Sequence, residues 1–135
     1  MIWHDDLLCR FFSVDDVQLF QKNLRLRNTV EFERVYNARL AVSDELLIVF
    51  VLPNNLQVSR LGLSVSRKVG NAVVRNRWKR LIREAFRKNC VSFKRCIDLV
   101  VLPQRNANLV GGQKIESSFN KLISRAVRRI LEHEK

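Results

Sequence analysis

Residues 60–88 read RLGLSVSRKVGNAVVRNRWKRLIREAFRK, an alternating segment followed by a strongly basic one. In residues 60–66, apolar side chains alternate with small ones, which predicts a strand with one buried face and one open face. The apolar positions are Leu61, Leu63 and Val65, and the small ones are Gly62, Ser64 and Ser66. We expect the small residues to leave room for a bulky group against this face of the sheet.

Residues 71–88 have the pattern of an amphipathic helix. At about 100° per residue, one side of this helix is apolar and the opposite side is basic. The apolar stripe consists of Val74, Trp78, Leu81, Ile82 and Ala85. The basic side consists of Asn76, Lys79, Arg80, Arg83 and Arg87, with Arg75 and Arg77 at its border. The helix is therefore expected to anchor its apolar side in the core and to present its cations to solvent.

The positive charge of the chain is concentrated in this region. The 135 residues include 25 Lys and Arg and 13 Asp and Glu, a net charge of +12, and residues 60–88 hold ten of the basic residues with one acid, Glu84. A solvated charged face is the ordinary explanation of surface cations. Two features favour an anionic partner instead: Glu84 is the only acid of the helix, so its basic face lacks the i,i+4 carboxylates that normally relieve such a face, and the helix is rich in arginine, whose planar fork suits phosphate oxygens. Nucleic acid is the usual partner of so basic a small protein.

The rest of the chain predicts an α+β domain. Asn28 and Glu31 form a capping-box pattern before a short helix over residues 29–38. Apolar runs at residues 46–52 and 97–102 predict buried strands, and a long apolar stripe predicts a C-terminal helix. That stripe consists of Ile115, Phe119, Leu122, Ile123, Ala126, Val127, Ile130 and Leu131. The expected order is helix, strands, helix, strand, helix, and the 47% of apolar residues suffice for one core.

The basic segment resembles the signature of the bacterial ribonuclease P protein subunit. The hallmark of that family is an Arg-Asn-Arg sequence in a basic helix with further cations after it. The residues that carry this hallmark are Arg75, Asn76, Arg77, Lys79, Arg80 and Arg83. The resemblance extends from about residue 24 to residue 131, and it includes an LRLR start, an EFERVY helix at residues 31–36, a strand ending in Phe50 and a DLVVLP strand near the end.

This resemblance implies a sandwich of three helices and a mixed four-stranded sheet, with an unusual left-handed β-α-β crossover around the basic helix. It implies a protein that assists a catalytic RNA in removing the 5′ leader from precursor tRNA. The RNA subunit would carry out the phosphodiester hydrolysis, with Mg²⁺ ions that the RNA holds. By similarity, the residues that bind the catalytic RNA are Arg75, Asn76, Arg77, Lys79, Arg80, Arg83 and Arg87.

The same resemblance implies a second surface, a cleft between the first helix and the sheet that holds the single-stranded leader. The matching positions are Phe32, Tyr36, Phe50, Arg60, Arg67 and Lys68. Aromatic faces stack on bases of any sequence and cations follow the backbone, which suits leaders of varied sequence. Core packing is the alternative reading of Phe32 and Phe50, whereas the polar tip of Tyr36 favours a surface position.

Residues 1–22 have no counterpart in this resemblance and form an atypical, acidic N-terminal extension, to which we assign no function. Residues 23–135 are expected to form a single RNA-binding domain. No apolar run is long enough for a membrane span, and charged residues interrupt residues 1–20 too often for a secretory signal. The odd number of cysteines, three, argues against a disulfide framework and for buried or free thiols in a reducing compartment. We therefore expect a cytoplasmic protein.

The sequence shows no pattern of catalytic or metal-binding residues. Between residues 60 and 131 the acids are Glu84, Asp98 and Glu116, which are widely spaced, whereas a divalent metal site needs clustered carboxylates. The cysteines lack the C-x-x-C spacing of a zinc site, and no glycine-rich phosphate loop is present. We expect the protein to bind no metal, cofactor or small-molecule substrate and to cut nothing by itself.

Three alternatives to this function remain open. A structural or general RNA-binding protein fits the composition, but it gives no purpose to the aromatic helix opposite the small-residue face of the sheet. A protein-only endonuclease would cleave precursor tRNA with magnesium in the absence of an RNA subunit. A DNA-binding helix-turn-helix is less favoured, because the basic helix follows a strand and not a partner helix.

Overall fold

The computed structural model describes residues 25–104, 107 and 110–134, so the extension at residues 1–22 lies outside the described residues. The elements are α3 (Thr29–Asn37), β1 (Ala41–Ser43), β2 (Leu47–Pro53), β3 (Arg60–Leu63), the 3-10 turn η2 (Arg67–Val69), α4 (Ala72–Asn89), the 3-10 turn η3 (Cys90–Ser92), β4 (Ile97–Pro103) and α5 (Gly112–His133). This order confirms the prediction of an α+β fold with helix, strands, helix, strand and helix.

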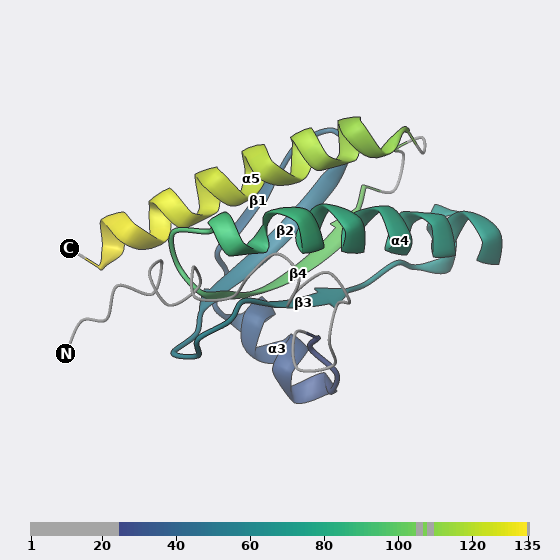
Figure 1. The fold of residues 1–135 in the computed structure, drawn as a ribbon. Coiled ribbons are helices and arrows are strands. Elements are labelled where there is room, and N and C mark those ends of the chain that lie inside the picture. Colours follow the sequence, from purple (N-terminus) through teal and green to yellow (C-terminus); the bar gives the residue numbers. More distant parts are fainter. Residues whose placement is uncertain (1–24, 105–106, 108–109, 135) are drawn as a thin grey trace.

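The four strands form one mixed sheet in the order β1-β2-β4-β3. β2 pairs antiparallel with β1 and β4, whereas β3 pairs in parallel with β4. The helices α4 and α5 lie side by side on one face of the sheet, and α3 lies on the other face (Figure 1). The connection from β3 through α4 to β4 crosses in the left-handed sense (Figure 1). This is the hand that the family resemblance implies, against the strong right-handed default.

Alternation along the strands gives each face of the sheet its own core. The larger core includes Leu47, Val49 and Val51 of β2 with Trp78 of α4 and Phe119 of α5, all fully buried. Phe50, between two of these β2 residues in sequence, belongs to the smaller core with Val100 and α3. Two long helices thus cover one face of the sheet, whereas a single nine-residue helix covers the other.

Two strands differ from the sequence prediction. The sequence does not predict β1, because its three residues, AVS, are too few to show a period. The alternation predicts a strand over residues 60–66, but β3 ends at Leu63. Ser64 N–H still donates to Val101 O over 3.2 Å, after which the chain turns into η2. The last small residues of the alternation therefore lie beyond the end of the strand.

The described cysteines have different chemistry. Cys90 is a free thiol, and its burial raises its pKa to about 11, so it stays protonated at neutral pH. Cys96 is also buried, and it is not a free thiol. The expectation of buried or free thiols is therefore confirmed for Cys90 and wrong for Cys96.

Candidate nucleic-acid interface

The basic helix α4 is fixed by its first turn and by its apolar side. The side chain of Asn71 accepts a hydrogen bond from Val74 N–H at 3.0 Å and so caps the helix. Trp78 and Ile82 are fully buried, and all the residues of the predicted apolar stripe belong to the larger core or pack against it. Phe86 adds to this stripe and is also fully buried. The opposite side of α4 is thereby directed to solvent.

Six of the predicted RNA-binding residues lie on this outward side and form no ion pair in the part of the chain that the structure describes, although the charge of Arg80 helps to lower the pKa of the Glu84 carboxyl. We call them the α4 face: Arg75, Asn76, Arg77, Lys79, Arg80 and Arg83. Arg75 and Lys79 are half-buried, and the others are exposed. The Nε of Arg75 is shielded from solvent and has no hydrogen-bond partner among the described residues.

Arg87, the seventh predicted residue, differs from the α4 face. Its Nη2 lies 2.6 Å from Oε2 of Glu84, three residues earlier in the helix. The hydrogen bond from Arg87 lowers the pKa of the Glu84 carboxyl, and the same bond raises the pKa of the Arg87 guanidinium. Both groups stay charged and the pair is neutral as a whole, so Arg87 attracts a phosphate less than its neighbours do.

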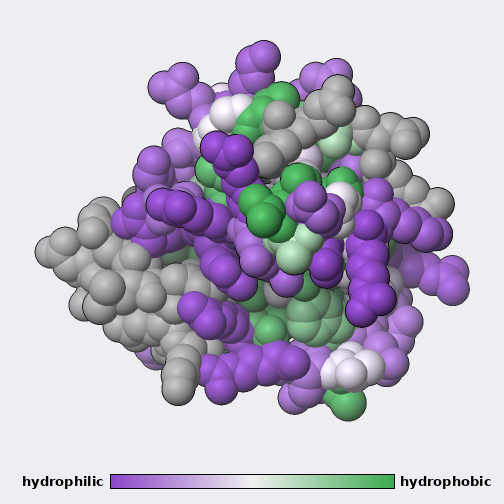
Figure 2. Space-filling model, turned by 90° about the vertical axis from the view of Figure 1, so that its right-hand side faces the viewer, coloured by the Kyte–Doolittle hydropathy of each residue, from purple (hydrophilic) through white to green (hydrophobic). Residues whose placement is uncertain are grey.

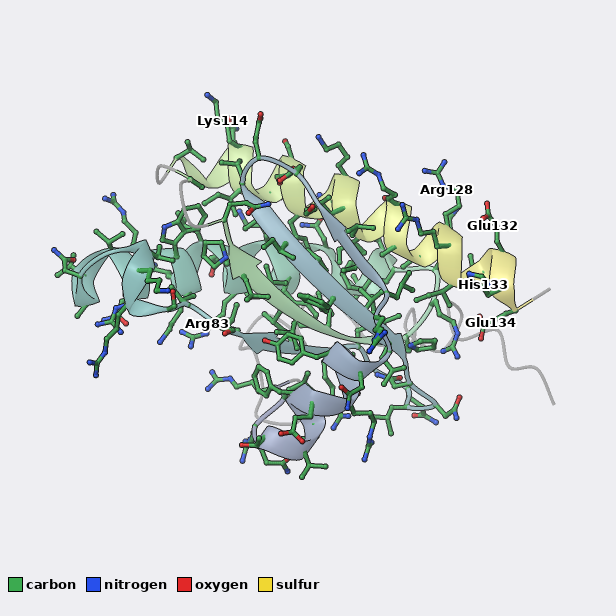
Figure 3. All side chains as sticks on the ribbon, turned by 180° about the vertical axis from the view of Figure 1, so that it is seen from behind. Arg83, Lys114, Arg128, Glu132, His133 and Glu134 are labelled. Atoms are coloured by element: carbon green, nitrogen blue, oxygen red, sulfur yellow. The ribbon has the colours of Figure 1, made fainter. Side chains whose placement is uncertain are left out.

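Arg83 extends the α4 face around the edge of the sheet. The edge strand β3 contacts α4, and Arg25 forms a parallel bridge with Leu61 of β3. Burial lowers the pKa of Arg83, and the charge of Arg25 lowers it further, so two cations approach each other at this edge. Arg83 points from α4 toward the side of the molecule that carries α3 (Figure 3). Positive charge therefore continues from α4 toward the α3 face of the sheet.

The predicted aromatic residues come together where α3 crosses the sheet. A Cβ atom on Gly62 would lie 2.8 Å from Cζ of Phe32, so glycine is what allows α3 to approach β3 this closely. Tyr36 meets Phe50 edge to face, with the ring centroids 4.9 Å apart. All three aromatic side chains are half-buried and pack against the smaller core. Each ring thus combines core packing with an exposed part.

Arg60 is held by two carboxylates. Its Nε and Nη2 lie 2.9 and 2.6 Å from the two oxygens of Asp98, and its Nη1 lies 2.7 Å from Oε2 of Glu31 on α3. The bond to Asp98 raises the pKa of Arg60. The pKa of Glu31 is lowered, chiefly by a hydrogen bond from the backbone N–H of Arg27 and further by Arg60. Arg60 therefore ties α3 to β3 and β4, and its charge is already matched.

A pocket of about 660 Å³ opens on the α3 face, at the end of the sheet that α3 leaves uncovered. Its lining consists of Asp44, Glu45, Ile48, Ser64, Ser66, Val69, Leu102, Pro103, Gln104 and Ala107. Arg67 and Lys68 are exposed on η2, between two of the lining residues in sequence. Toward this end of the sheet, apolar surface lies in a hollow bordered by hydrophilic side chains (Figure 2). Small residues and open space therefore coincide, as the alternation in residues 60–66 predicts.

The acidic side chain of Asp44 at this pocket is used by the fold. Its carboxylate accepts hydrogen bonds from the backbone N–H groups of Leu46 and Leu47 at 2.8 and 2.9 Å, and from the hydroxyl of Ser118 on α5. Burial by itself would raise the pKa of Asp44, but these hydrogen bonds together lower it below its ordinary value. The negative charge of Asp44 is thus stabilised by hydrogen-bond donors of the fold itself.

Reasoning from the sequence missed the apolar part of the pocket. Ile48 and Leu102 belong to runs that predict wholly buried strands, yet both are half-buried at the uncovered end of the sheet. The two residues are partners in the register of β2 and β4, and Ser64 follows the strand on the other side of β4. Strand register is the signal that identifies this surface, and a single sequence does not contain it.

Among the described residues, no three His, Cys, Asp or Glu side chains are placed to hold a metal ion together. The helices of this same part of the chain include none that is long and apolar enough to cross a membrane. The candidate site thus consists of a cationic helix face, three aromatic rings and an adjacent pocket.

The chain is similar to known proteins over most of its length. A family model described as Ribonuclease P covers residues 20–127. The ribonuclease P protein component of Clostridium novyi is 44% identical over 108 residues, which are 78% of this chain and 96% of that protein.

Two solved structures have the same architecture. The RNase P protein of Staphylococcus aureus has 33% sequence identity and a TM-score of 0.67, covering 76% of this chain and 94% of that one. The RNase P protein of Thermotoga maritima, solved with 1-(4-fluorophenyl)-2-thiourea, has 31% sequence identity and a TM-score of 0.70. The match covers 75% of this chain and 98% of that one. With a family match over most of its length, a curated relative of high identity and the same fold, this chain belongs to the ribonuclease P protein family.

Proposed function

We propose that this chain is the cytoplasmic protein subunit of a ribonuclease P, in which it binds the catalytic RNA and the 5′ leader of precursor tRNA. The RNA subunit carries out the hydrolysis with Mg²⁺, and the protein binds no metal, cofactor or small-molecule substrate. The observation that supports this proposal is the continuity of two surfaces. Cations of α4 that form no ion pair in the described chain continue through Arg83 around the edge of β3 to the aromatic side of α3.

The α4 face supplies binding to the catalytic RNA. Its four arginines present planar donors that match phosphate oxygens, and its apolar side holds them on a rigid helix. Neutralising RNA phosphates releases condensed counterions, which lets a folded RNA form and hold Mg²⁺ at cellular salt. Arg87 contributes less to this binding, because Glu84 already neutralises its charge.

The surface between α3 and the sheet supplies binding to the leader. We call it the α3 cleft and define it by Phe32, Tyr36 and Phe50, the pocket beside them, and Arg67 and Lys68 on η2. Bases stack on the exposed parts of the rings and enter the pocket, while the two exposed cations follow the backbone. Arg60 maintains this cleft by holding α3 on the sheet. Neither stacking nor phosphate contact reads base identity, so the cleft accepts leaders of different sequence.

Reconstitution tests this function. The full chain, added to a bacterial ribonuclease P RNA at low magnesium, is expected to restore removal of the leader from precursor tRNA. In the presence of the RNA, precursor tRNA is expected to bind more tightly than mature tRNA. Cleavage by the protein without RNA would instead establish a protein-only endonuclease. Equal binding of precursor and mature tRNA would favour a general RNA-binding protein.

The substitution Tyr36→Leu tests the cleft separately from the α4 face. We expect it to weaken binding of precursor tRNA to the reconstituted complex by about 5- to 150-fold, since one base–aromatic stack contributes about 1–3 kcal/mol. Affinity for mature tRNA is expected to stay unchanged. Val30→Leu, at a 62% exposed position of the same helix, is the control and should leave both affinities unchanged. Equal losses for precursor and mature tRNA would remove Tyr36 from the leader site.

A further inference from the structure

The outer side of α5 carries a second line of cations, which the proposed function does not use. We call it the α5 stripe, and it consists of Lys114, Lys121, Arg125, Arg128 and Arg129. At about 100° per residue these side chains fall within an arc of about 100°, and Lys114 and Arg128 stand about 21 Å apart along the helix. Lys114 and Arg128 point to the same side of α5, away from α4 (Figure 3).

The α5 stripe lies on the flank of α5 next to β1. Nζ of Lys121 lies 3.8 Å from Oδ2 of Asp44, directly after β1, and Nη1 of Arg129 donates to the backbone oxygen of Ala41 at 3.4 Å. The helix α4 packs along the other flank of α5. The stripe and the α4 face are therefore separate surfaces, so an RNA segment that lies along α4 does not cover the stripe.

The charges of the stripe are poorly relieved within the described chain. Arg125 is four residues from both Lys121 and Arg129, a spacing at which like charges repel on a helix. Glu132 is four residues after Arg128, yet the two form no ion pair in the described structure. Lys121 remains 60% exposed beside an Asp44 that already accepts three other hydrogen bonds. An anionic partner relieves this repulsion better than solvent does.

The absence of stacking groups on α5 indicates which anion fits. The one Phe, Tyr or Trp of this helix, Phe119, is fully buried, and the exposed neighbours of the cations include Ser117 and Ser124. A single strand is bound by stacking its bases on aromatic rings, as in the α3 cleft. A duplex instead offers phosphates and 2′-hydroxyl groups, which cations and serine hydroxyls recognise.

We propose that the α5 stripe binds the phosphate backbone of a double-stranded RNA segment, independently of the RNA on the α4 face. In a complex of this protein with a folded RNA, the chain then binds two RNA segments, one along α4 and one along the opposite flank of α5. This site requires no particular base sequence, because all its donors face backbone groups.

The test compares two variants that lose the same charge. Lys114→Gln/Lys121→Gln/Arg128→Gln removes three exposed cations of the stripe, and Arg34→Gln/Arg39→Gln/Lys94→Gln removes three exposed cations elsewhere. Each full-length protein is titrated, at several salt concentrations, with a blunt RNA duplex of about 20 base pairs. This duplex is somewhat longer than the roughly 16 base pairs that a duplex-binding domain spans. The stripe variant is expected to bind at least about tenfold more weakly, with a log–log salt slope shallower by about 2–3, and the control variant to change little.

Equal losses in the two variants would overturn the proposal, because they would reflect net charge alone. A larger loss for a single-stranded oligouridine than for the duplex would overturn the assignment to double-stranded RNA. The variant Lys114→Arg/Lys121→Arg/Arg128→Lys keeps the charges and is expected to bind as the parent chain does, which separates charge from helix stability. No catalytic RNA enters this test, so its failure leaves the reconstitution result untouched.

Discussion

Replacement of Arg75 and Arg77 by glutamine is expected to weaken binding of the chain to a ribonuclease P RNA about 100-fold. Each guanidinium–phosphate contact is worth about 1.5 kcal/mol, and two such contacts correspond to about two powers of ten in Kd. Neither side chain pairs with a carboxylate in the described chain, so the substitutions remove no ion pair of the fold. Filter binding measures the loss, and an unchanged unfolding temperature shows that the fold is intact.

Arg87→Gln is the matched control on the same helix. Because Glu84 already neutralises Arg87, we expect this substitution to weaken binding less than about threefold, against about tenfold for Arg77→Gln alone. With about six phosphate contacts, the log–log salt slope of the parent chain should lie near −4 to −5, and it should become shallower by about 1–2 in the double variant. If Arg87→Gln costs as much affinity as Arg77→Gln, or if the parent slope is near flat, the α4 face is not the RNA site.

The helix α4 was predictable because its period repeats over 18 residues and a cap precedes it. The sequence predicts a helix over residues 71–88, and the observed helix is Ala72–Asn89. The two differ by one residue at each end, and Asn71 is the cap. The burial of Trp78 and the outward direction of Arg77 follow from the same period. Local periodicity therefore predicts which side of a helix packs in the core and which side faces solvent.

The sequence did not predict which cations are already neutralised. Arg60 is bound by Asp98 and Glu31, which are 38 and 29 residues away, and no local pattern indicates such contacts. The pocket at Ile48 and Leu102 likewise depends on strand register. The hand of the crossover also came from the family resemblance, since the physical default is the opposite one. Non-local contacts thus decide whether the charge of a basic residue is matched within the fold or left open to a partner.

The second large effect is expected at Asp98, in the substitution Asp98→Asn. Asp98 is 4% exposed and accepts hydrogen bonds from Arg60 and from Nδ2 of Asn54 at 2.8 Å. An amide at this position removes the charge that faces Arg60 and leaves the guanidinium, with 19% of its side chain exposed, to Glu31 alone. Breaking such a pair from one side costs about 3–5 kcal/mol in the free energy of unfolding, a large part of the stability of a domain this size.

Thermal and urea unfolding measure this loss, and the midpoint temperature should fall by about 10–20 °C. Glu84→Gln is the control: it breaks an ion pair whose carboxylate is 46% exposed, and it should change the free energy of unfolding by less than about 1 kcal/mol. The double variant Arg60→Gln/Asp98→Asn should be less destabilised than the sum of its two single variants, because the two side chains stabilise the fold through each other. If Asp98→Asn is as mild as Glu84→Gln, the network does not hold α3 on the sheet.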